Sequence, residues 1–167
     1  NDMDPSRSTF TYGSMPIGLE FQTTIWAYDS TNFLGDVVFK KYRIINKGNT
    51  TIDSLFFAYW MDSDLGDAAD DFAGCDPYYS LTYVYNGDND DGGGIGHTYG
   101  TPPPAVGHMF VQGPIVAGLP SDSAFINNEW RNGYINLPMS SFGVFLGGTT
   151  LYRDPQMGVY AGTLELY

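Results

Sequence analysis

Apolar and polar residues alternate through residues 17–28 with the two-residue period of a β-strand. The odd positions form a largely apolar face, and the even positions form a more polar one. The first face holds Ile17, Leu19, Phe21, Thr23, Ile25 and Ala27, and the second holds Glu20, Gln22, Thr24, Trp26 and Tyr28. We therefore expect a strand over residues 17–28.

A second pattern, between residues 37 and 61, predicts a β-hairpin. Residues 37–45 and 52–61 are rich in β-branched and aromatic side chains, and Asn46, Lys47, Gly48 and Asn49 lie between them. Asparagine and glycine tolerate the positive φ that a tight turn requires. Apolar side chains occupy both faces of residues 52–61, which is typical of a central strand.

The rest of the chain predicts further strands at residues 79–85, 107–112, 115–117, 140–146 and 159–167. Residues 123–131 predict a short irregular or 3₁₀ segment, and the long loops are expected at residues 62–77 and 86–104. About eight or nine strands favour an all-β fold, a two-sheet antiparallel β-sandwich of immunoglobulin-like or jelly-roll-like type with long Asp/Gly-rich loops. A barrel is the alternative. We expect residues 1–16 to form an extended N-terminal arm and residues 17–167 to form this single domain.

The composition supports the all-β class. Aromatic residues make up 16% of the 167 residues, and 21 glycines and 10 prolines are spread along the chain. No segment keeps a 3.6-residue apolar period, as a long amphipathic helix would. The single cysteine, Cys75, rules out an internal disulfide. It is either a small buried side chain or a partner for a cysteine of another chain.

The charge of the chain narrows its partners. With a net charge of -12, the protein lacks the lysines and arginines that nucleic acids and anionic membrane surfaces attract. No apolar run approaches the length of a membrane-spanning helix, so we expect no membrane insertion.

Acidic residues concentrate between residues 62 and 91. This stretch holds nine of the 19 acidic residues, and no lysine or arginine occurs between Lys47 and Arg131. Carboxylates this dense repel one another unless a cation offsets their charge. Ca²⁺, a hard cation bound by oxygen ligands, is the simplest candidate. Since weak calcium sites are filled outside cells, we also expect an extracellular protein.

Two acidic loops are the predicted calcium sites. The stronger one comprises Asp62, Asp64, Asp67, Asp70, Asp71 and Asp76, and the weaker one comprises Asn86, Asp88, Asp90 and Asp91. The weaker set is not an EF-hand, because Asp91 stands where that loop needs glycine and His97 where it needs glutamate. The strand at residues 79–85 separates the loops, which places them at opposite ends of the sandwich unless the first folds back. The alternative is that both are merely solvated acidic loops.

The sequence carries no motif for a known catalytic mechanism. His97 and His108 are the only histidines, and no nucleophile elbow, zinc-binding histidine pair or lysine-containing phosphate loop is present. Aspartates are abundant, yet no acid–base pair for glycoside hydrolysis stands out by position. We therefore expect that the protein is not an enzyme.

Glycan binding is the alternative function. Trp26 lies on the more polar face of its strand, and Trp130 lies in a polar segment. Exposed aromatic rings such as these, with Tyr99 in a loop, can stack on sugar rings. The competing interpretation is that the tryptophans fill the core or cover strand edges.

Several strings resemble one group of proteins. Residues 42–47 are YRIINK, residues 57–66 are FAYWMDSDLG, residues 70–76 are DDFAGCD and residues 85–92 are YNGDNDDG. With residues 137–142 and 154–155, these strings resemble β-rich segments of large secreted bacterial surface proteins, many of which carry a C-terminal signal for type IX secretion. The resemblance implies export and a β-rich surface role, and it implies no established chemistry.

We therefore expect a non-enzymatic structural protein of the extracellular space or cell surface. It would be a calcium-stabilised β-sandwich that assembles with copies of itself into a filament or a surface layer. Terminal strands can complete the sheet of a neighbouring copy. The expected assembly contacts are Phe10 and Tyr12 near the N-terminus and Leu164 and Leu166 in the last predicted strand. Surface glycans are the alternative partner.

Overall fold

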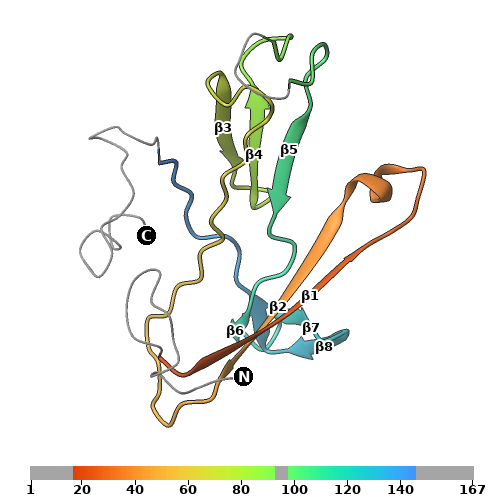
Figure 1. The fold of residues 1–167 in the computed structure, drawn as a ribbon. Helices are drawn as coiled ribbons and strands as arrows, with labels where there is room; N and C mark the ends of the chain where they lie inside the picture. The colour runs from red at the N-terminus through yellow and green to blue at the C-terminus, as the bar shows by residue number, and fades with distance from the viewer. Residues whose placement is uncertain (1–16, 93–97, 146–167) are drawn as a thin grey trace. The chain divides into compact units, whose positions relative to one another are not determined.

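The structure is all-β, as the sequence predicts. The computed structural model describes residues 17–92 and 98–145, which contain nine strands in antiparallel pairs and one 3₁₀ turn (Figure 1). The described strands form several small sheets, and none of these sheets closes into a barrel. The chain divides into two compact units, Asn1–Ala58 and Tyr59–Tyr167.

The first unit is built on a long β-hairpin. β1 (Leu19–Ala27) pairs antiparallel with β2 (Val38–Asn46) along its whole length. A 3₁₀ turn, η2 (Phe33–Asp36), lies in the connection, and Asn32 caps it by accepting a hydrogen bond from the Leu34 N–H at 2.9 Å. Both strands are confirmed close to the predicted bounds.

β2 takes a different partner from the predicted one. The hairpin of residues 37–45 with residues 52–61 is wrong, because β2 pairs with β1 and the described residues after it, up to Met61, form no strand. The N–H groups of Lys47 and Gly48 both donate to the carbonyl of Gly18, which precedes β1, at 2.8 and 3.2 Å. These bonds hold the end of β2 beside the start of β1.

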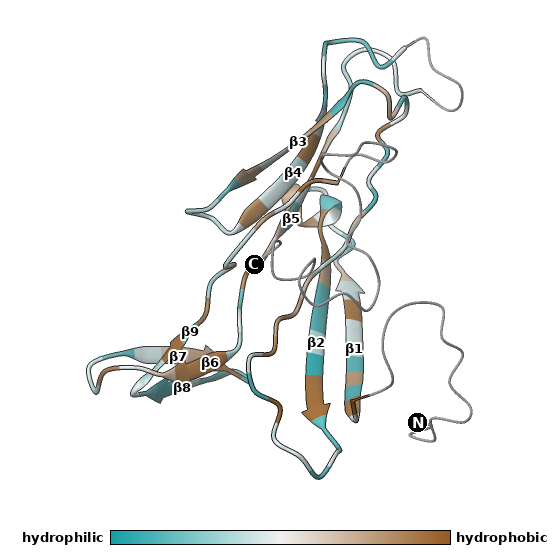
Figure 2. Ribbon diagram, turned by 90° about the vertical axis from the view of Figure 1, so that its left-hand side faces the viewer, coloured by the Kyte–Doolittle hydropathy of each residue, from teal (hydrophilic) through white to brown (hydrophobic). Residues whose placement is uncertain are grey.

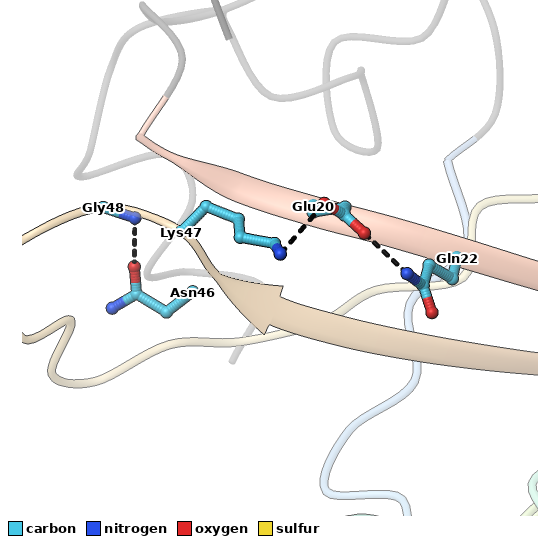
Figure 3. Close-up of polar contacts among 5 residues, drawn as sticks. All are labelled: Glu20, Gln22, Asn46, Lys47 and Gly48. Carbon is cyan, nitrogen blue, oxygen red and sulfur yellow. Dashed lines mark hydrogen bonds and ion pairs between the residues drawn. The ribbon is translucent and has the colours of Figure 1, made fainter. Parts of the chain in front are cut away.

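Side chains stabilise the turn after β2. Asn46 accepts a hydrogen bond from the Gly48 N–H at 2.9 Å (Figure 3). It also donates one to the Thr50 carbonyl at 2.8 Å. The Lys47 ammonium lies 3.5 Å from the Glu20 carboxylate on β1. The predicted turn at residues 46–49 therefore exists, but it ends the β1–β2 pair and opens no new hairpin.

One face of this hairpin is largely apolar and exposed, although it also carries Thr23, Lys40 and Asn46. Residues opposite each other in the register share a face, so the odd positions of β1 lie beside the even positions of β2. On that face Phe21, Ile25, Val38 and Tyr42 are 57%, 61%, 60% and 46% exposed. Figure 2 shows apolar and polar positions mixed along both strands. No residue between Ile17 and Ala58 is fully buried.

The second unit begins with a three-stranded antiparallel sheet in the order β3–β4–β5. β3 (Asp71–Asp76) pairs with β4 (Leu81–Asn86), and β4 pairs with β5 (Ala105–Met109). β4 and β5 confirm the strands predicted near residues 79–85 and 107–112. β3 lies inside the segment predicted as a loop, so that prediction is wrong for the second half of the segment.

Packing across β3 and β4 explains the strand that the sequence pattern did not predict. Gly74 is opposite Tyr83, and a Cβ on this glycine would lie 2.5 Å from the tyrosine ring. The glycine therefore makes room for the ring. Phe72 and Tyr85 form another cross-strand pair, with ring centroids 6.0 Å apart. Such pairs stabilise a sheet, and they exist only once β3 lies beside β4.

Two smaller pairs follow along the chain. β6 (Ile115–Ala117) pairs with β9 (Tyr134–Asn136), and β7 (Ser123–Ile126) pairs with β8 (Glu129–Asn132). The strand predicted at residues 115–117 is thereby confirmed.

The β7–β8 hairpin corrects the irregular segment predicted for residues 123–131. Its two turn residues, Asn127 and Asn128, have φ values of 52° and 64°. A two-residue turn with positive φ at both positions matches the right-handed twist of the flanking strands. Asparagine tolerates this left-handed region better than most residues do. The Asn-Asn pair was therefore a hairpin signal.

Few apolar side chains are fully buried in the part of the chain that the structure describes. Leu65 and Ala124 are 8% and 0% exposed there. The described part of the strand predicted at residues 140–146 forms no strand, and the preceding Met139 donates its N–H to the Ser80 hydroxyl at 3.3 Å. The strand predicted at residues 159–167 and the N-terminal arm lie outside the described residues. The two-sheet sandwich and the single domain stay predictions.

Candidate functional site

The two acidic segments meet at one end of the β3–β4–β5 sheet. β3 begins at Asp71 and β4 ends at Asn86, and these two residues are opposite each other in the register. Residues 62–70 and 87–92 therefore adjoin the same end of the β3–β4 pair. The opposite-ends prediction is wrong, and the folded-back arrangement that it allowed for is observed, because β3 runs antiparallel to β4.

Asp91 is a fully buried acid at this end, with 0% of its surface exposed. Its carboxylate accepts hydrogen bonds from the backbone N–H of Asp67, at 2.8 Å, and from that of Tyr99. Its own N–H and carbonyl bond to Gly100 at 3.1 and 3.2 Å. Gly66, with φ of 75°, lies against the carboxylate. Asp91 thus connects two segments that are distant in the sequence through charge-assisted hydrogen bonds.

Backbone amides also bond to two other aspartates. Asp71 Oδ2 accepts from the Leu65 N–H at 2.8 Å, and Asp67 Oδ1 accepts from the Ala69 N–H at 3.1 Å. Amide donors favour the ionised form of a carboxylate, but they carry no net charge to cancel its own. The negative charge of the cluster therefore remains.

The second acidic segment forms a tight local network after β4. Asn86, only 6% exposed, donates from Nδ2 to the carbonyl and to Oδ1 of Asp88 at 3.3 and 3.4 Å. Asp88 Oδ1 also accepts from the Asp90 N–H at 2.8 Å, and Asp90 Oδ1 accepts from the Thr101 hydroxyl at 3.2 Å. Asn86 and Asp91 are the two buried residues of this segment.

Three oxygen atoms at this end have no hydrogen-bond donor within the described residues. They are Oδ1 of Asp70, Oδ1 of Asp71 and Oδ1 of Asn86, and each is buried. A buried acceptor without a donor costs about 1–3 kcal/mol, and a charged one costs more. These three oxygens have therefore lost their hydration without gaining a hydrogen-bond donor from the described residues.

The pKa of the Asp70 carboxyl is raised by its surroundings. Loss of hydration raises the pKa of this carboxyl above its ordinary value of 3.8, and neighbouring carboxylates raise it further. Those carboxylates are, in order of effect, Asp67, Asp88 and Asp71. Members of both predicted calcium sites thus act on one residue.

Asp76 lies apart from this group. It is at the other end of β3, opposite Leu81. Its Oδ1 accepts hydrogen bonds from the N–H groups of Tyr78 and Tyr79 at 3.0 and 3.3 Å. This geometry stabilises the turn between β3 and β4.

Asp62 and Asp64 are exposed residues of the first acidic segment. Asp64 lines an open hollow of about 360 Å³ together with Gly66, Thr98 and Tyr99. Across residues 17–92 and 98–145, no three acidic, histidine or cysteine side chains group closely enough to hold a metal ion by themselves. Any cation bound here therefore needs amide or carbonyl oxygens as well.

The three aromatic residues predicted for glycan binding lie on different elements. Trp26 is on β1, and its ring stacks on that of Phe39 with centroids 5.3 Å apart. Trp130 is on β8, 71% exposed, with the Phe125 ring 5.3 Å away. Tyr99, 63% exposed, precedes β5. Trp130 is the most exposed of the three.

The remaining predicted residues are the four assembly contacts and the single cysteine. Phe10, Tyr12, Leu164 and Leu166 lie outside the described residues. Cys75 is a half-buried free thiol on β3. Gly66 was not predicted as the neighbour of Asp91, although a glycine within a run of aspartates was an available signal.

Comparisons with known proteins yield no family model, no curated protein and no solved structure that matches this chain. In the described ranges, no helix has the length and apolar character needed to cross a membrane.

Proposed function

We propose that this chain is a non-enzymatic structural protein that associates with copies of itself in an extracellular or cell-surface setting. The observation that carries the proposal is the exposed apolar face of the β1–β2 hairpin. Phe21, Ile25 and Val38 on this face are each more than half exposed. Several large apolar side chains exposed on one face of a sheet are a candidate interaction site.

The hairpin has both a reason and a means to associate. A two-stranded sheet is marginally stable by itself, and burying each large apolar side chain contributes about 1.5–3 kcal/mol. Among the described strands, β1 pairs only with β2, and the edge of such a two-stranded sheet is a place where a further strand can add. A second copy supplies the same apolar face and the same edges, which suits a symmetric contact.

Light scattering coupled to size-exclusion chromatography tests this proposal. We expect the wild-type chain to form dimers or larger species, and electron microscopy to show whether these extend into filaments or sheets. Ile25→Glu should release monomers, because it replaces the most exposed apolar side chain of this face with a charged one. Thr24→Glu is the matched control on the opposite face, since Ile25 and Thr24 are opposite Lys40 and Lys41.

Two results would contradict self-association. One is a wild-type protein that stays monomeric at all concentrations, which means that the apolar face is covered within the chain. The other is equal loss of association in both variants, which means that added charge and not the apolar face is responsible.

Glycan binding is the second candidate, favoured by the exposure of Trp130 and the support of its ring by Phe125. A ring held from one side offers its other side for stacking. Retention on an insoluble polysaccharide should be lost in Trp130→Ala and kept in Trp130→Phe. If the wild-type protein is not retained, this candidate is excluded for the polysaccharides tested.

The setting and the architecture belong to the same proposal. The acidic composition and the resemblance to secreted bacterial surface proteins support export, and the several antiparallel sheets support a two-sheet sandwich. Screening against glycosides and peptides tests the absence of catalysis. Turnover that Asp71→Asn abolishes would contradict a purely structural role.

A further inference from the structure

Three residues with buried oxygens, unpaired within the described chain, lie where β3 begins and β4 ends. Asp71 and Asn86 are opposite each other there, and Asp70 directly precedes Asp71. Asp70 also lies close to the other strand, since a Cβ on Gly87 would be 2.7 Å from the Asp70 carbonyl oxygen. The Oδ1 atoms of these three residues have no donor within the described residues.

Asn86 points to a ligand independently of the acidic residues. It is only 6% exposed, and buried amide oxygens nearly always accept a hydrogen bond. Its Nδ2 group donates to Asp88, whereas its Oδ1 has no donor in the described ranges. Asn86 is opposite Asp71 in the register, so the two side chains share one face of the sheet. Repulsion among solvated carboxylates does not account for a neutral acceptor buried beside them. A cation satisfies neutral and charged oxygens together.

No positively charged side chain lies near these residues in the sequence. Lysine and arginine are absent from residue 48 to residue 130. A bound divalent cation would balance the charge of these carboxylates.

We propose that Asp70, Asp71 and Asn86 provide ligands for one calcium ion at this end of the sheet, with backbone carbonyls and water completing the coordination. The donors are all oxygens, as hard cations require, and Ca²⁺ accepts about six to eight of them in flexible geometry. Mg²⁺ demands a near-ideal octahedron and retains its water. Two carboxylates and one amide also agree with the lack of a three-residue acidic metal cluster in the described chain.

Asp91 has a supporting role in this site. Its carboxylate accepts amides from residues 67 and 99, so it fixes the segment before β3 against the segment after β4. The proposed ligands all lie in the second unit, whereas β1 and β2 lie in the first.

Calorimetric titration of the whole chelator-treated chain with CaCl₂, and separately with MgCl₂, tests the site. We expect one calcium ion per chain, weaker binding of magnesium, and a higher Tm in calcium than in EDTA. Asp71→Asn and Asn86→Leu should weaken calcium binding by about tenfold or more. Asp53→Asn, which removes the same charge from an exposed position in the first unit, should leave it unchanged.

Asn86→Asp keeps the test decisive if the Leu variant does not fold. A ligating oxygen at this position predicts calcium affinity at least equal to that of the wild type, together with a lower Tm in EDTA. The proposal is overturned if the wild-type chain binds no calcium and melts identically in EDTA. It is also overturned if magnesium binds equally well, or if Asp53→Asn weakens binding as much as Asp71→Asn.

Discussion

The carboxylate of Asp91 occupies the space beside Gly66 where a Cβ would stand. Gly66 also has φ of 75°, a conformation that L side chains rarely adopt. Replacement by alanine therefore meets a conformational cost and a steric one. We expect Gly66→Ala to lower the free energy of unfolding by roughly 2–4 kcal/mol, as measured in urea.

Gly133→Ala is the matched control for this prediction. Gly133 has a similar φ of 78°, but no atom lies within 4 Å of an added Cβ. It should therefore show only the conformational cost of roughly 1–2 kcal/mol. Equal losses in the two variants would mean that the contact between Gly66 and Asp91 has no energetic weight.

Asp91→Asn should destabilise the fold although it preserves the shape of the side chain. The carboxylate accepts two backbone N–H groups, and an amide would present its own NH₂ group to one of them. With the residue fully buried, the mismatch should cost about 2–3 kcal/mol in urea unfolding with chelator present. Asp64→Asn, an exposed control in the same cluster, should change stability by less than about 0.5 kcal/mol.

With chelator present, the free energy of unfolding should depend on pH through the protonation of Asp70. Its raised pKa means that the folded chain binds this proton more tightly than the unfolded chain, so the ionised group destabilises the fold above that pKa. This destabilisation is removed as pH falls from neutrality through the raised pKa toward 3.8. Asp70→Asn should therefore be more stable than wild type at neutral pH, by a margin that shrinks in acid. Urea unfolding at several pH values measures the margin, and a constant margin contradicts the assignment.

Replacing Asn128 by alanine or by glycine should change the stability of the fold differently. Asn128 has φ of 64°, which glycine adopts without strain and alanine does not. We expect Asn128→Ala to reduce the free energy of unfolding by roughly 1–2 kcal/mol and Asn128→Gly to maintain or slightly raise it. Loss of stability in both variants would show that the asparagine side chain, and not its backbone conformation, stabilises the hairpin.

Local patterns proved reliable where one strand's own residues determined the outcome. The alternation from Leu19 to Ala27 predicted β1 and its apolar face, because a two-residue period has no helical counterpart. The apolar run 115–117 predicted β6 in the same way. Patterning was less informative where glycine or asparagine interrupted a strand, as at Gly74 and Asn127, because their effect depends on the neighbouring strand.

Strand partners were beyond the reach of these patterns. Residues 52–61 have more apolar side chains than β1, yet β2 pairs with β1. That pairing is accompanied by hydrogen bonds from the N–H groups of Lys47 and Gly48 to the Gly18 carbonyl. The same limit applied to the acidic loops. Sequence spacing suggested two separate sites, whereas β3 brings the two loops to one end.

The sequence by itself determined the all-β class, the period of the longest strand and the density of uncompensated acid between residues 62 and 91. These properties depend on composition and on neighbours along the chain. Only the tertiary structure decided that Asp71 lies opposite Asn86 and that Asp91 is buried against Gly66. Each of these contacts joins residues at least 15 positions apart, and such pairing is set by the packing of whole strands and not by local preference.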